Sequence, residues 1–226
     1  RIGSYFKSIR RLKIISSSNR FDILIVNNID TLILFKLSNI FKKVNIKIII
    51  EISDLRAHTY SIGIKAKLLR MSERLVFKFV DKLIVTSPKF YEMYYCKILV
   101  NNQYFLLENK PLSTLLPKKF EKIKNDKIVI GIVGLLLQGK PYETLFETIK
   151  NDDKYEVHIY GKGIYEKLVK NYSDKYKNIK YFGEYNFFQD SGRLYSSIDI
   201  LYMPYDTTNG SLNNKLALPN KLYEAM

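Results

Sequence analysis

The sequence predicts an α/β fold made of two successive parallel sheets with helices packed on them. Two observations support this class. Short apolar runs rich in Ile and Val recur along the chain, and most are followed by a segment whose apolar residues have helical spacing. Strands buried on both faces read as continuous apolar runs, and strands that alternate with helices form parallel sheets. A lysine-rich stretch interrupts the series once, so we expect two Rossmann-like domains with parallel sheets facing across a cleft.

The first domain is expected over residues 1–111. Residues 1–18 have apolar residues near helical spacing, and a run of serines ends that helix. The run DILIV opens the strand series, and each later strand is an apolar run of the same kind. The expected strands are 22–26, 47–52, 83–86 and 105–107, and the expected helices are 1–18, 29–43, 62–80 and a segment from Lys89.

Residues 112–126 carry Pro117 and a lysine cluster, and we expect them to link the domains; the second domain is then 127–226. Its expected strands are 127–133, 155–160, 179–182 and 200–203, and its expected helices are 141–150, 164–176, 188–197 and a helix that starts near Pro219. Proline suits the first helical position because its φ is preset and it has no N–H to leave unpaired. Ligands of such sheets bind at the carboxyl ends of the strands, so we expect the site in the loops there.

The composition narrows the class of protein. With 226 residues, 46% of them hydrophobic, the chain can bury one large core or two small ones. One cysteine, Cys96, and no signal-like stretch indicate a reducing compartment, so we expect a cytoplasmic protein without disulfides. No apolar run approaches the roughly 20 residues that span a bilayer. Because the chain begins at Arg1 and stops at Met226 inside an expected helix, we expect an internal fragment of a longer protein.

The net charge of +15 is unevenly distributed. Residues 1–110 hold 20 basic and 8 acidic residues, a net charge of +12, which leaves only +3 for the remainder. A basic half suggests an anionic partner, either membrane lipid or nucleic acid. No nucleic-acid-binding motif is present, so we expect no nucleic-acid partner.

The final stretch combines a strand, a polar loop with Asn209-Gly210 and the start of a helix near Pro219. A helix N-terminus has free N–H groups and a partial positive charge that suit a phosphate. Lys221 adds a cation, and Glu224, one turn later, can accept a hydrogen bond from a sugar hydroxyl. These residues predict capture of a nucleotide diphosphate, although a capped surface helix would have the same residues.

The motif PNKLYEAM at 219–226 resembles the donor-site segment of retaining GT-B glycosyltransferases, in particular glycosyltransferase family 4. The resemblance implies a GT-B fold with an acceptor-side first domain and a donor-binding second domain. It implies that Asn220, Lys221 and the helix N-terminus bind the donor diphosphate, and that Glu224 binds the ribose. The family has an acidic residue eight positions before this Glu, where this chain has Leu216. The family's first strand with its glycine-rich loop, and its closing helices, are absent from this sequence.

The segment VGLLLQGK at 133–140 lies between an expected strand and an expected helix. Gly134 lets the backbone approach a ligand, and Lys140 can reach a phosphate as a point charge. A turn with a solvated lysine would have the same residues. The family often reads VGRL…KG here, which implies that Lys140 contacts the diphosphate and places Leu135 where the family has Arg.

Two further turns follow strands of the second domain. Gly161-Lys162-Gly163 resembles the family's glycine loop at the nucleotide, so Gly161 and Gly163 are assigned to nucleotide binding. Gly183-Glu184-Tyr185 resembles the turn beside the base, which Tyr185 is expected to stack on. Plain strand-to-helix turns and a surface tyrosine are the alternatives.

In the first domain, Asp54 follows a strand and is a candidate to hold a sugar hydroxyl; the alternative is a turn or helix cap. His58, in the following loop, is a second candidate for the acceptor site. Related sequences often have His where this chain has Ser53. Asn109 stands where the family has a turn into the linker, and we assign it a hinge role.

No metal site is expected, because the chain has two histidines, one cysteine and no carboxylate cluster at ligand spacing. No side chain is assigned as nucleophile or base beyond the candidates Asp54 and His58. The resemblance implies substrate-assisted front-face attack with retention, without a metal, and with the nucleotide-diphospho-sugar as co-substrate in place of a cofactor.

Residues 62–80 form the clearest amphipathic helix, with an apolar stripe and a basic complement. The stripe is Ile64, Leu68, Met71, Leu75 and Phe79, and the basic residues are Lys65, Lys67, Arg70, Arg74 and Lys78. We expect the stripe to pack on the sheet and the basic face to be solvated. Docking of this helix on an anionic membrane is the alternative, which the resemblance to enzymes with lipid-linked acceptors also suggests.

The predicted function is transfer of a sugar from a nucleotide-diphospho-sugar to a saccharide or lipid-linked acceptor. The expected setting is bacterial surface polysaccharide or glycolipid synthesis, in the cytoplasm or peripherally on the inner face of the plasma membrane. Two alternatives stay open: a nucleotide-sugar epimerase of GT-B fold, and a basic GT-B-like scaffold that binds membrane or another polyanion without catalysis. The charge, Leu135 and Leu216 favour the scaffold, whereas the order of the motifs favours the enzyme.

Overall fold

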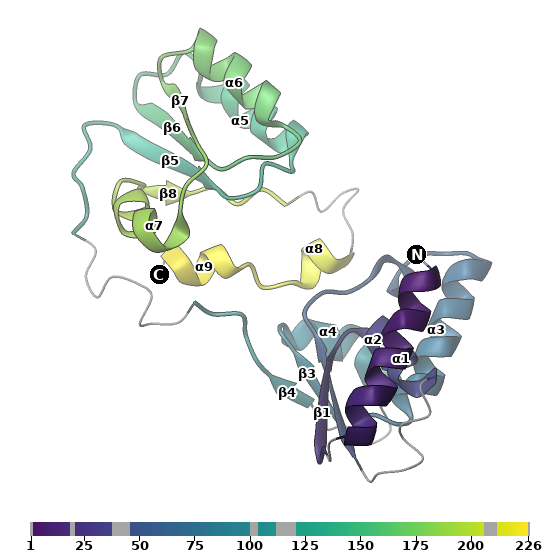
Figure 1. Ribbon diagram of the computed structural model, residues 1–226. Helices are drawn as coiled ribbons and strands as arrows, with labels where there is room; N and C mark the ends of the chain where they lie inside the picture. The colour runs from purple at the N-terminus through teal and green to yellow at the C-terminus, as the bar shows by residue number, and fades with distance from the viewer. Residues whose placement is uncertain are drawn as a thin grey trace. The chain divides into compact units, whose positions relative to one another are not determined.

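The computed structural model describes residues 2–18, 21–37, 46–99, 104–111, 121–205 and 212–225 (Figure 1). They form two compact units, Arg1–Asn109 with Ser211–Leu218, and Lys110–Gly210 with Pro219–Met226. Each unit contains one four-stranded sheet whose strands all run parallel. The α/β class with parallel sheets is therefore confirmed, while the cleft between the sheets stays a prediction.

The first unit has the strand order β1-β2-β3-β4. Its strands are β1 (Ile23–Asn27), β2 (Lys47–Ile52), β3 (Lys82–Val85) and β4 (Tyr104–Leu106). Its helices are α1 (Ile2–Ser18), α2 (Ile29–Leu37), α3 (Ile64–Phe77), α4 (Pro88–Met93) and α8 (Leu212–Leu216), with 3-10 turns η2 (Ala57–Thr59) and η3 (Tyr95–Lys97). The expected elements are present, although the helix predicted over 29–43 is described only to Leu37 and its remainder lies outside the described residues.

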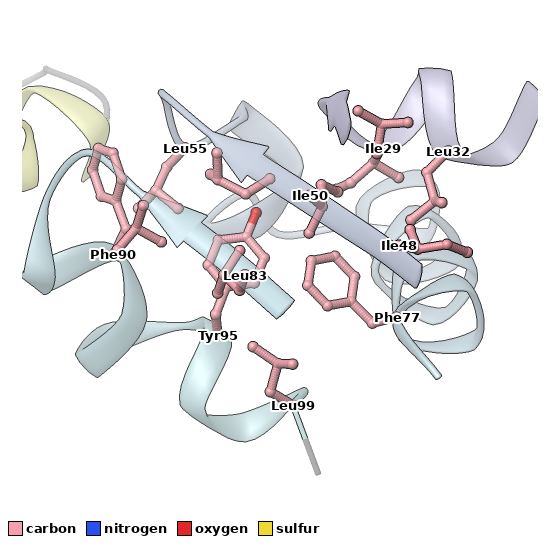
Figure 2. Packing of buried hydrophobic residues seen from close by; sticks show 13 residues of the cluster. Ile29, Leu32, Ile48, Ile50, Leu55, Phe77, Leu83, Phe90, Tyr95 and Leu99 are labelled. Atoms are coloured by element: carbon pink, nitrogen blue, oxygen red, sulfur yellow. The ribbon is translucent and has the colours of Figure 1, made fainter. Parts of the chain in front are cut away.

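The core of the first unit lies on one face of its sheet. Alternate strand residues such as Ile48, Ile50 and Leu83 pack against apolar residues of α2, α3 and α4 (Figure 2). Sequential strands joined by right-handed crossovers place their connecting helices on a single face. On the opposite face, Ile23 and Ile25 of β1 are 56% and 59% exposed.

Helix α3 does not pack on the unit through the face that was expected to be buried. The stripe predicted to pack on the sheet is exposed in the structure, by 81% at Ile64 and 58% at Leu75. The residues that face inward are Ala66, Arg70, Glu73 and Phe77. The expectation was wrong because the hydrophobic pattern does not show that a charged residue in this helix has partners inside the unit.

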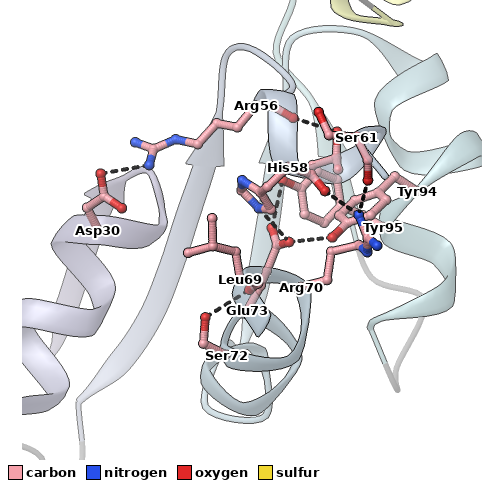
Figure 3. Close-up of polar contacts among 11 residues, drawn as sticks. Asp30, Arg56, His58, Ser61, Leu69, Arg70, Ser72, Glu73, Tyr94 and Tyr95 are labelled. Atoms are coloured by element: carbon pink, nitrogen blue, oxygen red, sulfur yellow. Dashed lines mark hydrogen bonds and ion pairs between the residues drawn. The ribbon is translucent and has the colours of Figure 1, made fainter. Parts of the chain in front are cut away.

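That charged residue is Glu73, which is fully buried (Figure 3). Its carboxylate accepts hydrogen bonds from the hydroxyl groups of Tyr94 and Tyr95, the latter at 3.2 Å, and lies 3.1 Å from Nε2 of His58. Burial raises the pKa of both tyrosines well above the ordinary value, and the neighbouring Glu73 carboxylate raises it further. Buried charges persist only where such partners replace water.

Arg70, one turn before Glu73, also turns inward and holds the loop after β2. Its guanidinium donates to the backbone carbonyls of His58 at 2.6 Å and Ser61 at 2.8 Å. With Glu73 on His58, two side chains of α3 therefore fix the loop that contains η2 (Figure 3).

The second unit has the strand order β7-β6-β5-β8. Its strands are β5 (Ile128–Val133), β6 (Tyr155–Tyr160), β7 (Ile179–Gly183) and β8 (Ile200–Leu201), and its helices are α5 (Gly139–Ile149), α6 (Glu166–Lys175), α7 (Phe187–Ser196) and α9 (Asn220–Ala225). Helices α5 and α6 pack on one face of the sheet and α7 on the other, so this sheet is doubly wound (Figure 1).

Two segments differ from simple expectation. Helix α8 forms within the stretch interpreted as a polar loop, whose Asn209-Gly210 lies outside the described residues. Ser211–Leu218 groups with the first unit although it follows the second series of strands, and the remaining domain boundaries stay a prediction. In the expected linker, 112–120 lies outside the described residues, whereas Asn125 donates to the carbonyl of Ser197 in the second unit at 3.0 Å.

Among the described residues, no helix has both the length and the apolar character needed to cross a membrane.

We expect the Glu73 network to contribute strongly to the stability of the first unit. Glu73→Ala leaves two tyrosine hydroxyls without their acceptor and opens a cavity. Together these effects should lower the free energy of unfolding by roughly 2–4 kcal/mol. Glu73→Gln keeps the volume and one acceptor and should cost less. Glu92→Ala, which removes an exposed partner of Lys89, is the control. Urea unfolding followed by circular dichroism measures all three, and an equal effect of Glu73→Ala and Glu92→Ala would contradict this account.

Candidate functional site

The second unit has a pocket at the point where its strand order reverses. Strands β6 and β7 lie on one side of β5, and β8 lies on its other side. The β5–β8 boundary is therefore a topological switch point. In open α/β sheets, ligands bind outside the carboxyl ends of the strands at such a point. A pocket of about 180 Å³ lies there. It is lined by Ile132, Val133, Leu135, Leu137, Gln138, Tyr142, Tyr202, Met203, Pro204, Tyr205 and Lys221.

The loops after β5, β6 and β7 pack together through their backbones. The N–H of Gly134 donates to the carbonyl of Tyr160 at 2.8 Å, and the N–H of Gly161 donates to the carbonyl of Gly183 at 2.6 Å. Gly161 has φ +125°, and a Cβ there would lie 1.9 Å from the carbonyl oxygen of Gly134. A Cβ on Gly163 would likewise meet the backbone of Leu136 at 2.4 Å. Gly161 and Gly163, assigned to nucleotide binding, thus have a packing role that explains them without a ligand.

Lys221 supplies a cation to the pocket. The side chain lies over Gly134, since a Cβ on that glycine would be 2.6 Å from Nζ of Lys221. Gly134 itself has φ +104°, which favours glycine. The structure therefore brings together two of the four residues predicted to bind diphosphate. One of them, Lys221, lines the pocket, whose lining is otherwise largely apolar and aromatic.

The other two residues predicted for the diphosphate lie elsewhere on the unit. Lys140 is 85% exposed, lies 3.7 Å from Glu143 and borders a separate hollow along α5. Asn220 is exposed at the first residue of α9. Their roles stay predictions.

Glu224 and Tyr185, predicted at the ribose and the base, are close together. Tyr195 of α7 donates a hydrogen bond to Oε2 of Glu224 at 2.6 Å. Burial, then the charge of Glu224, raises the pKa of the half-buried Tyr185. Burial and the same carboxylate raise the pKa of Tyr195 far above its usual range. Tyr195 was not identified from the sequence, because nothing distinguishes it among 18 tyrosines.

Several pocket residues were also missed. Tyr202 and Tyr205 follow β8, so the rule that ligands bind at strand ends could have identified them. Tyr142 lies on α5, and burial raises its pKa to about 12. No local signal marks Tyr142, since its spacing on the helix is that of a core residue.

The first unit has a polar pocket of about 280 Å³ at the carboxyl ends of β1 and β2. It is lined by Asn27, Asn28, Ile29, Glu51, Ile52, Ser53, Asp54, Arg56 and Tyr95. Asn28 has φ +83°, a left-handed conformation that asparagine tolerates better than most residues, and its side chain accepts from the N–H of Thr31 at 3.3 Å. Arg56 pairs with Asp30 at 2.7 Å.

The two acceptor-site candidates have different positions. Asp54 lines the pocket, and its carboxylate accepts a hydrogen bond from the side-chain amide of Asn213 at 2.9 Å. His58 is not among the lining residues, and only 12% of its side chain is exposed because it lies against Glu73. Asn109, assigned as a hinge, is the residue after which the chain passes from the first unit to the second.

In the part of the chain that the structure describes, no three His, Cys, Asp or Glu side chains gather as metal ligands.

No family model matches the sequence, and no curated protein matches it. Solved structures do match. The lipopolysaccharide outer core galactosyltransferase WaaB, in its apo form, is 14% identical with a TM-score of 0.62, over 87% of this chain and 54% of that one. Sucrose-phosphate synthase from Thermosynechococcus elongatus is 15% identical with a TM-score of 0.64, over 89% and 56%. HepE from Anabaena, in complex with UDP, is 11% identical with a TM-score of 0.61, over 87% and 55%.

This chain therefore spans about half the length of the structures it matches. At these identities the likeness shows the fold, which is the GT-B fold of glycosyltransferases.

The loop packing predicts unequal effects of two glycine substitutions. Gly161→Ala combines a positive φ with a backbone collision, whereas Gly183→Ala, at φ +78°, meets no atom within 4 Å. We expect Gly183→Ala to cost about 1–2 kcal/mol of stability and Gly161→Ala clearly more, with a distorted pocket. Thermal unfolding of both variants measures this, and equal midpoints would show that the loops are not tightly packed.

Proposed function

We propose that the protein is a glycosyltransferase that moves a sugar from a nucleotide-diphospho-sugar to a hydroxyl acceptor. The observation that carries the proposal is the position of Lys221, over Gly134 in a pocket at the switch point of the second sheet. Transfer of a glycosyl group develops negative charge on the departing diphosphate. A fixed cation in a largely apolar pocket stabilises that charge more than water does.

Glu224 is proposed to hold the ribose of the donor. A carboxylate accepts hydrogen bonds from vicinal hydroxyl groups, and the bond from Tyr195 keeps its side chain in one orientation. Tyr185, beside it, offers a ring for the base. The similar structure of HepE is described in complex with UDP, which makes UDP the first nucleotide to test.

The polar pocket of the first unit is proposed to hold the acceptor, a saccharide or a lipid-linked saccharide. Its carboxylates, amides and guanidinium group offer both acceptors and donors for sugar hydroxyls. Asp54 is the residue proposed to orient the attacking hydroxyl.

The resemblance of PNKLYEAM to glycosyltransferase family 4 supports a retaining reaction. We propose that Lys221 supplies the positive charge at the diphosphate that a metal ion supplies in other transferases. The likeness to WaaB, named as a lipopolysaccharide outer core galactosyltransferase, supports a role in bacterial surface polysaccharide or glycolipid synthesis.

Nucleotide binding tests the proposal directly. We expect one of UDP, GDP or ADP to raise the thermal midpoint of the protein, because a ligand that binds only the native state stabilises it. Lys221→Ala should weaken that nucleotide's affinity by about tenfold or more, the loss of one charge-assisted hydrogen bond. Lys140→Ala should change it by about twofold or less, since that lysine is exposed outside the pocket.

Isothermal titration calorimetry gives both affinities. If no nucleotide shifts the midpoint of the folded protein, the proposed transferase is wrong and the non-catalytic scaffold gains support. If Lys140→Ala alone removes binding, the diphosphate site lies at the start of α5 instead.

A second proposal concerns the membrane. Helix α3 exposes a continuous apolar stripe beside basic residues, a combination that inserts shallowly into an anionic lipid surface. The exposed stripe, which was expected to be buried, is the observation that favours peripheral binding on the inner face of the plasma membrane. Lipid-linked acceptors would be presented at that surface.

Sedimentation with phosphatidylglycerol vesicles tests membrane binding. We expect Leu68→Ser with Leu75→Ser to weaken binding at both low and high salt, because each removes apolar contact. Lys65→Ala with Lys67→Ala should weaken it by about tenfold or more, mainly at low salt. Lys170→Ala with Lys175→Ala, on a helix of the second unit, is the matched control. If the protein sediments with the vesicles at neither salt concentration, membrane binding through this surface is excluded.

A further inference from the structure

The segment from Leu212 to Ala225 contains two short helices that belong to different units. Helix α8 groups with the first unit and α9 with the second, and residues 217–219 join them. Helix α8 contacts Asp54, which lines the pocket of the first unit, and α9 contributes Lys221 to the lining of the pocket of the second unit.

Helix α8 is anchored in the core of the first unit. Its residues Leu212 and Leu216, with Ala217, pack against the buried apolar cluster of that unit. The hydroxyl of Ser87, which is 1% exposed, donates to the backbone carbonyl of Leu216. Leu216, which aligns with the family's first acidic residue, is therefore part of this anchor and does not line the pocket around Lys221.

Asn213 uses both ends of its side-chain amide on the loop after β2. Its Oδ1 accepts from the N–H of Leu55 at 2.7 Å, and its Nδ2 donates to Oδ1 of Asp54 at 2.9 Å. A carboxylate on an exposed loop residue would otherwise sample several rotamers. One bond holds the Asp54 carboxylate at the pocket of the first unit, and the other fixes Asn213 to the backbone of the next residue.

Helix α9 carries the residues proposed to bind the donor. Lys221 lies over Gly134, and Glu224 accepts from Tyr195. A diphosphate on Lys221 would thus act on the same continuous segment that holds Asp54.

We propose that Asn213 is a positioning residue for Asp54, and that the segment Leu212–Ala225 strengthens this hold when a nucleotide diphosphate occupies the donor pocket. The inference rests on the proposed function, because it takes the pocket around Lys221 as the donor site and Asp54 as an acceptor-side residue.

Hydrogen exchange of the Leu55 amide in the full chain tests the positioning. Asn213→Ala should speed this exchange by about tenfold, since it removes the acceptor of that N–H. Lys215→Ala, exposed on the same helix, should leave the exchange of the Leu55 amide unchanged.

The swap of Asp54→Asn with Asn213→Asp should restore protection, because the new carboxylate accepts from both the Leu55 N–H and the new amide. Asn213→Asp alone should not, because it opposes two carboxylates. Unchanged exchange in Asn213→Ala, or a swap that fails to restore protection, would overturn the positioning.

The same measurement with UDP, GDP and ADP tests the response to nucleotide. With the nucleotide that binds, Leu55 exchange should slow by at least about fivefold in the wild-type protein and remain unchanged in Asn213→Ala. A nucleotide that raises the thermal midpoint without slowing Leu55 exchange would overturn the inference and leave the proposed function intact. If none of the three binds, the proposed function itself is wrong and the coupling is wrong with it.

Discussion

The buried carboxylate of Glu73 determines much of the first unit. Because two tyrosine hydroxyls and His58 satisfy it, α3 turns a partly polar stripe toward the core and leaves its apolar stripe exposed. The same orientation lets Arg70 hold the loop after β2, which follows Asp54 in the sequence. One satisfied buried charge thus links the architecture of the unit to both its polar pocket and its exposed apolar surface.

In the second unit the corresponding constraint is backbone packing. Loops after β5 and β6 approach so closely that a side chain at Gly161 or Gly163 would collide with the backbone of Gly134 or Leu136. The loop after β5 also lines the pocket at the β5–β8 boundary, to which Lys221 contributes its side chain. The glycines that resemble a nucleotide-binding motif therefore have a structural role in the packing of these loops.

Contacts between residues far apart in the sequence hold candidate site residues in both units. Asn213 reaches Asp54 across 159 positions, and Glu224 meets Tyr195 from a different helix. Such pairs explain why a single short segment near the end of the chain matters to both units. Leu216 likewise has a structural role in the first unit, where it packs on the core and accepts a hydrogen bond from Ser87.

The sequence by itself determined the α/β class, the order of the strands and helices and the loops that border the pocket around Lys221, because hydrophobic periodicity and the punctuation by Gly and Pro are local signals. It also predicted Lys221, Glu224 and Asp54 as site residues, and those roles stay predictions. Only the tertiary structure decided which face of α3 is buried, that His58 pairs with Glu73, and that Tyr195 and Asn213 bond to Glu224 and Asp54. These depend on partners distant in sequence, and a polar residue gives no local sign that another part of the chain will satisfy it.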